Sequence, residues 1–142
     1  MSGLRRSADD LLRAATGARR VVRLCPACGS GEHGRPVALG SDAHVSISYA
    51  GDLVAVAWSY DGPVGIDVEL DIEQGADRQE WTRVEALLKA TGEGVRGWPD
   101  VTLPDLPSRP IDVPRGYVGT VVGTGVSWRL AGPAAQAGPA RP

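Results

Sequence analysis

The sequence has no phenylalanine, only two cysteines and two histidines among 142 residues, and no long apolar run. Without phenylalanine, its core must be built mainly from valine, leucine, isoleucine and alanine. No segment approaches the roughly 20 apolar residues that cross a bilayer, and no apolar stretch follows the first arginines as in a signal peptide. The formal net charge of −2 indicates no broad attraction to nucleic acid or to an anionic membrane. We therefore expect one cytoplasmic domain with a modest core.

Glycine and proline are abundant instead, with 19 and 11 residues, which favours turns and short strands over a helical bundle. Residues 7–16 have the pattern of a helix, in which Ser7 is the predicted N-cap and Gly17 the stop. A short apolar strand is predicted over residues 20–24. Residues 25–36 contain too much glycine and proline for regular structure, so we expect a loop there.

Three alternating segments follow, at residues 44–49, 53–59 and 64–69, with turn-forming sequences between them. Alternation of apolar and polar residues is typical of strands. Because short turns join consecutive strands most simply as antiparallel neighbours, the three segments predict an antiparallel meander.

The second half of the chain alternates between regular and irregular segments. Asp77 and Glu80 resemble a capping box, which predicts a helix from about residue 78 to 90. The proline-rich segment 95–115 is predicted to be an extended loop, followed by a closing hairpin of residues 117–122 and 126–130. The predicted fold class is α+β, an antiparallel meander packed on helices. The predicted domain division is one domain over 1–130, with halves of about 1–62 and 63–130, and a disordered tail over 131–142.

Acidic side chains stand at two points where they could share a cation. In a strand, Asp67 and Glu69 point to the same side. On the following helix, Glu85 and Lys89 lie one turn apart on one face. Because magnesium favours one or two carboxylates together with phosphate oxygens and water, these residues suggest a divalent metal beside a phosphate-bearing ligand. Taken alone, Asp67 and Glu69 are more typical of a solvated strand face, and Glu85 and Lys89 are as compatible with a helix-surface salt bridge as with a site.

Residues 65–69 read Gly-Ile-Asp-Val-Glu, and residues 81–89 read Trp-Thr-Arg-Val-Glu-Ala-Leu-Leu-Lys. In this order they resemble the signature of the 4′-phosphopantetheinyl transferases, Gly-Ile/Val-Asp-x-Glu followed by Trp-x-x-Lys-Glu-Ala-x-x-Lys. Residues 34–36 (Gly-Arg-Pro) are similar to the upstream Gly-Lys/Arg-Pro element of the larger, surfactin-synthetase-activating type. Residues 46–49 (Ser-Ile-Ser-Tyr) occupy the place of its Ser-His-Ser segment. The resemblance extends over about residues 8–130, and the chain looks like a shortened member.

The resemblance implies a magnesium-dependent enzyme that moves 4′-phosphopantetheine from coenzyme A to a serine of an acyl or peptidyl carrier protein. The serine hydroxyl attacks the β-phosphate and 3′,5′-ADP leaves, so catalysis consists mainly of positioning and charge stabilisation. It also implies a pseudo-dimer of two similar halves, with coenzyme A in the cleft between them.

The same resemblance assigns roles to particular residues. Asp67, Glu69 and Glu85 would hold the metal, and Glu85 would also take the proton of the carrier serine. Lys89 would contact a phosphate and take part in catalysis. The residues expected beside coenzyme A are Gly34, Arg35 and Pro36 at the nucleotide end, and Ser48, Tyr49 and Lys89 at the phosphates.

Three departures from the signature keep a second hypothesis open. Val84 stands where many members have lysine, and Tyr49 stands where they often have histidine. Only residues 70–80 separate the two motifs, whereas the larger type places several dozen residues there. The chain could therefore be a non-catalytic derivative that binds coenzyme A or a carrier protein without transfer.

A third hypothesis is a small zinc-binding interaction domain. Cys25 and Cys28 have the Cys-x-x-Cys spacing, and a structural zinc site needs four ligands. The chain offers only His33 and His44 beside them, so every cysteine and histidine would have to serve. The alternative is a turn-forming loop with buried thiols.

Overall fold

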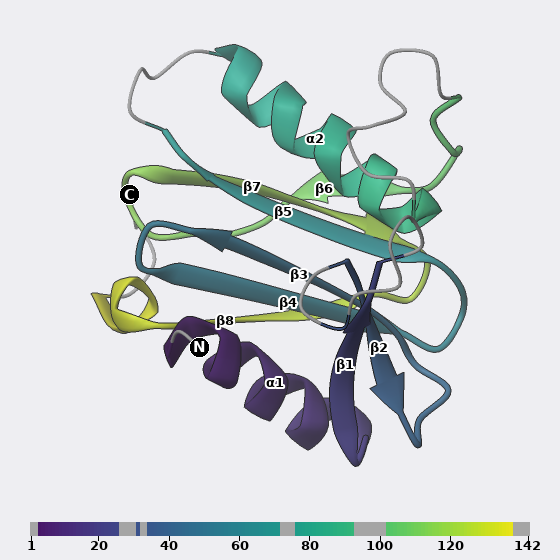
Figure 1. Cartoon of the computed structure of the whole chain (residues 1–142). Coiled ribbons are helices and arrows are strands. Elements are labelled where there is room, and N and C mark those ends of the chain that lie inside the picture. The colour runs from purple at the N-terminus through teal and green to yellow at the C-terminus, as the bar shows by residue number, and fades with distance from the viewer. Residues whose placement is uncertain (1–2, 26–30, 32–33, 72–75, 93–101, 138–142) are drawn as a thin grey trace.

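The computed structural model describes residues 3–25, 31, 34–71, 76–92 and 102–137. It has an α1 helix at the N-terminus and an α2 helix in the second half (Figure 1). The element bounds are α1 Gly3–Thr16, β1 Arg20–Leu24, β2 Arg35–Leu39, β3 His44–Ala50, β4 Leu53–Ser59, β5 Val64–Leu70, α2 Ala76–Thr91, β6 Ser108–Pro110, β7 Tyr117–Gly123, β8 Ser127–Ala131 and the 3-10 helix η2 Pro133–Ala137. The α+β class and the predicted strands within the first 70 residues are confirmed.

The strands form three antiparallel sheets, in the orders β1-β2, β3-β4-β8 and β5-β7-β6. The predicted meander is therefore wrong at its third strand, because β5 pairs with β7 and not with β4. The second edge of β4 is occupied by β8 instead, with Val54 opposite Ala131 and Trp58 opposite Ser127. Alternation identified each strand correctly, but it carries no information about which strand lies beside it.

The predicted closing hairpin is wrong for the same reason. β7 and β8 are both present, but β7 pairs with β5 and β6 in one sheet while β8 pairs with β4 in another. Residues 123–126 thus carry the chain from one sheet to the other, as residues 60–63 do after β4. The hydroxyl of Ser59 donates to the carbonyl of Thr124 at 2.6 Å and joins the two crossings.

Each three-stranded sheet is covered on its outer side by one helix (Figure 1). α1 packs on β3 and β4 through a cluster that contains Leu12, Val45 and Val56. α2 packs on β5 and β7 through a cluster that contains Leu87 and Val122. The inner faces of the two sheets share a third cluster, whose buried members are Leu53, Ala55, Ala57, Val64, Ile66, Val68, Ile111 and Val121.

Both helices begin earlier than predicted and end where glycine stops them. Ser7 is not an N-cap, because α1 begins at Gly3 and the hydroxyl of Ser7 donates to the Gly3 carbonyl within the helix. Asp77 lies inside α2, and Glu80 pairs with Arg83 rather than closing a capping box. Gly17 and Gly92 follow the two helices with φ of 73° and 83°, which only glycine adopts easily.

The segments predicted as irregular contain more structure than expected. β2 begins at Arg35, inside the predicted loop, and β6 lies inside the predicted extended segment 95–115, of which residues 95–101 are outside the described residues. The tail is ordered through residue 137, because Ala131 ends β8, η2 follows it, and Ala134 and Ala135 pack on the shared core. Residues 138–142 lie outside the described residues.

The division into halves also differs from the prediction. A cut near residue 62 separates β4 from β5, but β8 from the far end of the chain completes the first sheet. The first helix-covered sheet is therefore not a contiguous segment of sequence, whereas β5, α2, β6 and β7 of the second follow one another along the chain. None of the helices in the described part of the chain is both long enough and apolar enough to cross a membrane.

Gly65 sets the distance between β5 and α2. A Cβ atom at this position would overlap with the carbonyl oxygen of Ala86. We predict that Gly65→Ala forces α2 away from β5 and lowers the free energy of unfolding by about 3 kcal/mol, at the upper end of the usual range for overpacked cores. Urea unfolding of Gly65→Ala beside Gly116→Ala checks this. A Cβ at exposed Gly116 meets nothing within 4 Å, although its φ of 91° adds some strain.

Candidate metal centre

Three carboxylates meet where β5 faces α2. One oxygen from each of Asp67, Glu69 and Glu85 lies within 4.8 Å of the others. β5 supplies the first two because alternate side chains share a face, and α2 supplies Glu85 one turn before Lys89. The predicted convergence of these three side chains is thus present in the structure. Within the described residues, this is the one acidic, cysteine or histidine group with the geometry to hold a metal ion.

Asp67 is the buried member of the group, with its side chain 3% exposed. Its Oδ1 atom accepts from the Lys89 ammonium at 3.2 Å and lies 3.3 Å from the Ser48 hydroxyl. Its Oδ2 atom is buried with no hydrogen-bond partner. A buried carboxylate oxygen without a partner is costly unless something occupies its lone pairs. This orphaned oxygen, beside two further carboxylates, fits a divalent cation.

The acidic group does not carry three full charges when no cation is bound. Burial raises the pKa of Asp67 to about 8; the nearby Lys89 opposes that rise, while Glu69 and Glu85 add to it. Burial also raises the pKa of Glu85, reinforced by Glu69. Asp67 therefore holds a proton near neutral pH, and a metal that binds its carboxyl group has to displace that proton.

Lys89 has all three of its ammonium hydrogens assigned to nearby oxygens. Nζ lies 3.2 Å from the Ile47 carbonyl, 2.9 Å from the Ile66 carbonyl and 3.2 Å from Asp67 Oδ1. It thereby joins β3 to β5 and places a cation beside the buried carboxyl group of Asp67. The sequence predicted a phosphate contact for this residue, whereas in the structure its ammonium is directed into the protein.

At the seam where β3 lies beside β5, serine hydroxyl groups of β3 accept hydrogen bonds from backbone amides of β5. The Ile66 amide donates to the Ser46 hydroxyl at 3.1 Å, and the Val68 amide donates to the Ser48 hydroxyl at 3.0 Å. Both pairs are 20 residues apart, so the two strands run in the same direction at this seam. Ser48 is consequently buried beside Asp67, and its contact with the metal-binding residue follows from the strand geometry.

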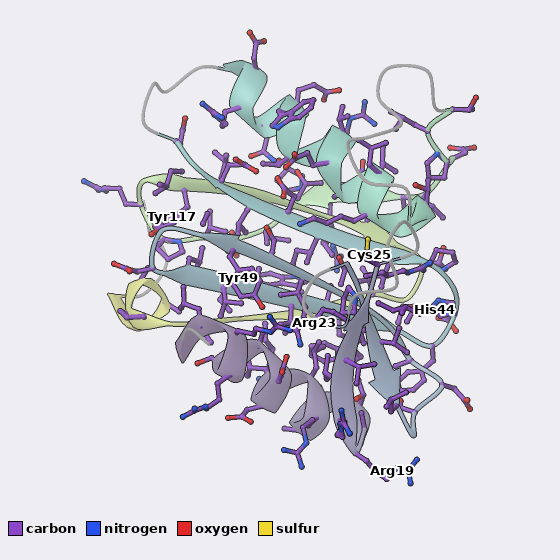
Figure 2. The ribbon with its side chains drawn as sticks, in the orientation of Figure 1. Arg19, Arg23, Cys25, His44, Tyr49 and Tyr117 are labelled. Carbon is purple, nitrogen blue, oxygen red and sulfur yellow. The ribbon has the colours of Figure 1, made fainter. Side chains whose placement is uncertain are left out.

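Tyr49 points to the opposite side of β3 from Ser48. Its hydroxyl accepts from Arg23 at 3.2 Å, and Arg23 also forms an ion pair of 2.7 Å with Asp9 of α1. Figure 2 labels Arg23 and Tyr49 beneath the seam. The structure thus separates Tyr49 from the carboxylates, although the sequence placed it beside the phosphates with Ser48.

The Gly-Arg-Pro element lies where the β1-β2 ribbon approaches the end of α2. Gly34 has φ of 102°, and a Cβ there would lie 2.6 Å from the backbone of Cys25. The Arg35 guanidinium lies against Gly92, since a Cβ on that glycine would be 2.8 Å from its NH1 atom. Arg35 is therefore brought to the same end of α2 as Lys89. Pro36, its neighbour, pairs with Arg23 across the ribbon.

A polar network that the sequence analysis missed supports α2 on the sheet. Gln79 donates to Thr120 Oγ1 at 2.7 Å and to the Gly119 carbonyl at 2.9 Å. Thr82 and Thr120 are fully buried, and their hydroxyl oxygens lie 2.7 Å apart. Thr120 stands directly opposite Asp67 in the sheet. The signal in the sequence was the spacing of Gln79, Thr82, Glu85 and Lys89, which places four polar residues on one side of a helix.

The proposed zinc ligands are only partly described. Cys25 is buried and His44 is exposed at the start of β3. Cys28 and His33 lie outside the described residues, so the structure does not test that site.

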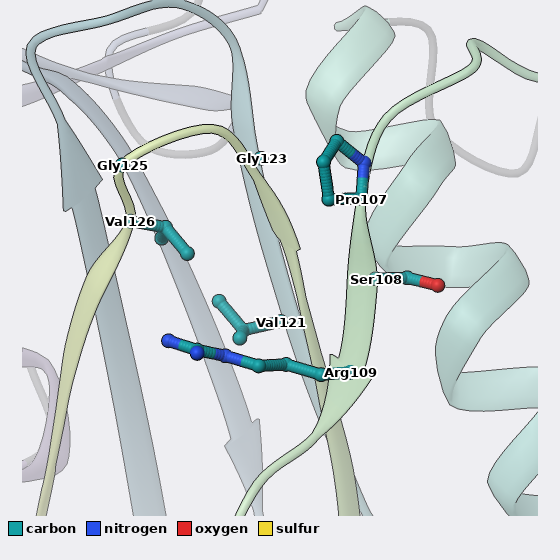
Figure 3. A pocket seen from close by; sticks show the side chains of 7 residues that line it. All are labelled: Pro107, Ser108, Arg109, Val121, Gly123, Gly125 and Val126. Carbon is teal, nitrogen blue, oxygen red and sulfur yellow. The ribbon is translucent and has the colours of Figure 1, made fainter.

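A hollow of about 230 Å³ lies between β6, the end of β7 and the start of β8 (Figure 3). The Arg109 side chain extends into it from β6, past Val121 (Figure 3). Val121 belongs to the shared core, whereas the adjacent Thr120 faces α2. The hollow is thus on the other side of β7 from the carboxylates, and none of them lines it.

Comparison with known proteins found no protein-family model, no curated protein and no solved structure that matches this chain.

Proposed function

We propose that the protein is a magnesium-dependent 4′-phosphopantetheinyl transferase that acts on coenzyme A and a serine of an acyl or peptidyl carrier protein. The observation that carries the proposal is the meeting of Asp67, Glu69 and Glu85 within 4.8 Å, with Lys89 in contact with Asp67. These are residues of the transferase signature. Asp67 and Glu69 come from β5, and Glu85 and Lys89 come from α2, which packs on β5.

The division of labour follows from the positions of the side chains. Asp67, Glu69 and Glu85 would hold magnesium, which would neutralise charge on the pyrophosphate of coenzyme A. Arg35 is the first residue of β2, and its guanidinium lies beside Gly92 at the end of α2. It is suited to the 3′-phosphate because a guanidinium donates two parallel hydrogen bonds. Glu85 is half-buried and has a raised pKa, which suits it to accept the proton of the attacking serine hydroxyl. The bond formed joins the serine oxygen to the β-phosphorus, and the bond broken releases 3′,5′-ADP.

The test is a transfer assay with the intact chain. The protein is incubated with coenzyme A, magnesium and an apo carrier protein, and the carrier is weighed by mass spectrometry. We expect a phosphopantetheine adduct, which Glu85→Ala should abolish. Glu80→Ala is the matched control, because Glu80 is on the same helix but exposed and paired with Arg83. The proposal fails if none of several carriers gains the adduct, or if Glu85→Ala transfers as fast as the unchanged chain.

One observation favours a second candidate, a non-catalytic protein of the same fold. The ammonium group of Lys89 donates to three protein oxygens. A phosphate could therefore bind this ammonium group only by competing with those oxygens. Isothermal titration calorimetry with coenzyme A separates the two candidates. Binding of coenzyme A with magnesium, without any adduct on a carrier, supports the non-catalytic one.

A further inference from the structure

The β1-β2 ribbon has an inner face that is tied to the rest of the molecule. Val21 and Ala38 pack in the cluster under α1. Arg23 on the same face is buried, with its ion pair to Asp9 and its hydrogen bond to Tyr49. These contacts hold the ribbon in a fixed orientation beside the first sheet (Figure 1).

The outer face of the ribbon carries apolar side chains into solvent. The register pairs Arg20 with Leu39, Val22 with Val37 and Leu24 with Arg35, so these six side chains share the face that points away from α1. Leu24 is 55% exposed, and Val37 and Leu39 are each 39% exposed. None of these apolar residues belongs to a core cluster of the described chain. Clustered apolar exposure of this kind marks interaction surfaces more often than scattered single residues do.

The charge on this face has one sign. The apolar residues of this face form a diagonal that runs from Leu39 through Val37 and Val22 to Leu24, and Arg20 and Arg35 stand at the two remaining corners. Arg19 lies beside Gly40 at the end of the ribbon (Figure 2). The described residues of the ribbon, 19–25 and 34–40, contain no aspartate or glutamate. The patch is therefore cationic on a chain whose net charge is −2.

We propose that the outer face of the β1-β2 ribbon is a docking surface for an acidic protein partner that presents an apolar stripe between its carboxylates. The apolar diagonal would cover that stripe, while Arg19 and Arg20 would meet the carboxylates and speed the encounter. A symmetric dimer in which two copies of this chain meet ribbon to ribbon fits poorly, because it would bring arginines against arginines with no acid on the described residues of either ribbon. The proposal does not depend on the transferase activity.

The probe is a synthetic amphipathic helical peptide with a leucine stripe flanked by glutamates, and its binding to the intact chain is followed by fluorescence anisotropy. Val37→Thr combined with Leu39→Thr should weaken binding at least fivefold. Leu70→Thr is the matched control, because Leu70 is also 39% exposed but lies at the end of β5, and it should bind within twofold of the unchanged chain. Arg20→Gln should reduce the salt dependence of binding, whereas Arg115→Gln should leave it unchanged.

A second measurement needs no variant and so does not depend on folding of the altered ribbon. In the unchanged chain, the peptide should shift the amide resonances of residues 20–24, 35 and 37–39 rather than those of β6 or η2. The proposal is overturned if these resonances stay in place, or if a peptide with lysines in place of the glutamates binds equally well. The proposal is also overturned if the chain binds phosphatidylserine vesicles more tightly than it binds the peptide and the same variants abolish that binding. It is likewise overturned if the chain forms a concentration-dependent dimer that the same variants abolish.

Discussion

Asp67→Asn is expected to lower the affinity for magnesium by roughly 100-fold or more and to abolish phosphopantetheine transfer. Groups that merely support a metal ligand already change affinity by about 10- to 100-fold, and Asp67 offers a buried oxygen that has no partner in the protein. Asparagine keeps the shape of the side chain, so the loss reports the charge and not a cavity. Isothermal titration calorimetry with magnesium, alongside the transfer assay, measures both effects.

Asp112→Asn is the control for that experiment, because Asp112 is exposed and lies beyond β6, away from the carboxylate group. It should bind magnesium and support transfer like the unchanged chain. Equal magnesium affinity in Asp67→Asn and Asp112→Asn would show that the three carboxylates do not form the metal centre.

The second large effect concerns stability as a function of pH. The pKa of Asp67 is about 8 in the folded protein, against an ordinary value of 3.8. The folded state therefore binds more protons than the unfolded state between these values, and the free energy of unfolding should fall as pH rises from 4 to 8. With 1.36 kcal/mol for each unit of pKa, the fall contributed by Asp67 is about 6 kcal/mol at most.

Asp67→Asn isolates this contribution, since it removes the titrating group without emptying its space. In the absence of metal, the variant and the unchanged chain should have similar free energies of unfolding at pH 4 to 5. By pH 9 the variant should be the more stable of the two. Urea unfolding at a series of pH values gives the difference directly. A difference that does not change with pH would contradict the raised pKa. Saturating magnesium should reverse the trend for the unchanged chain, because the metal binds the deprotonated carboxylates.

The local structure was largely predictable from the sequence, and the pairing of strands was not. The short apolar segment 53–59 lies between two turn sequences and forms β4, and the residues from Trp81 to Lys89 have helical spacing and form part of α2. Which edge of β4 is occupied depends on β8, which lies far along the chain and pairs with it only through tertiary packing. No short-range pattern encodes that choice, so the simplest antiparallel arrangement was predicted and was wrong.

The acidic group was predictable because each of its residues obeys a local periodicity. Asp67 and Glu69 share a strand face, and Glu85 shares a helix face with Lys89, so only the packing of α2 on β5 had to be supplied. Contacts across the seam could not be predicted, because Ser46 and Ile66 meet through tertiary packing of edge strands. For the same reason, the sequence did not show that Lys89 binds backbone carbonyls of both β3 and β5.

The exchange of β8 into the first sheet has a consequence for synthesis on the ribosome. A chain is synthesised from its N-terminus at about 5–20 residues per second, so α1, β3 and β4 leave the ribosome before β8 does. Until residues 127–131 appear, one edge of β4 has unpaired backbone groups, and Trp128 and Leu130 are missing from the core that both sheets share. An unpaired strand edge is a template for association with other chains. The nascent protein therefore passes through a stage at which its first sheet is most exposed to aggregation, and the emergence of β8 from the ribosome ends that stage.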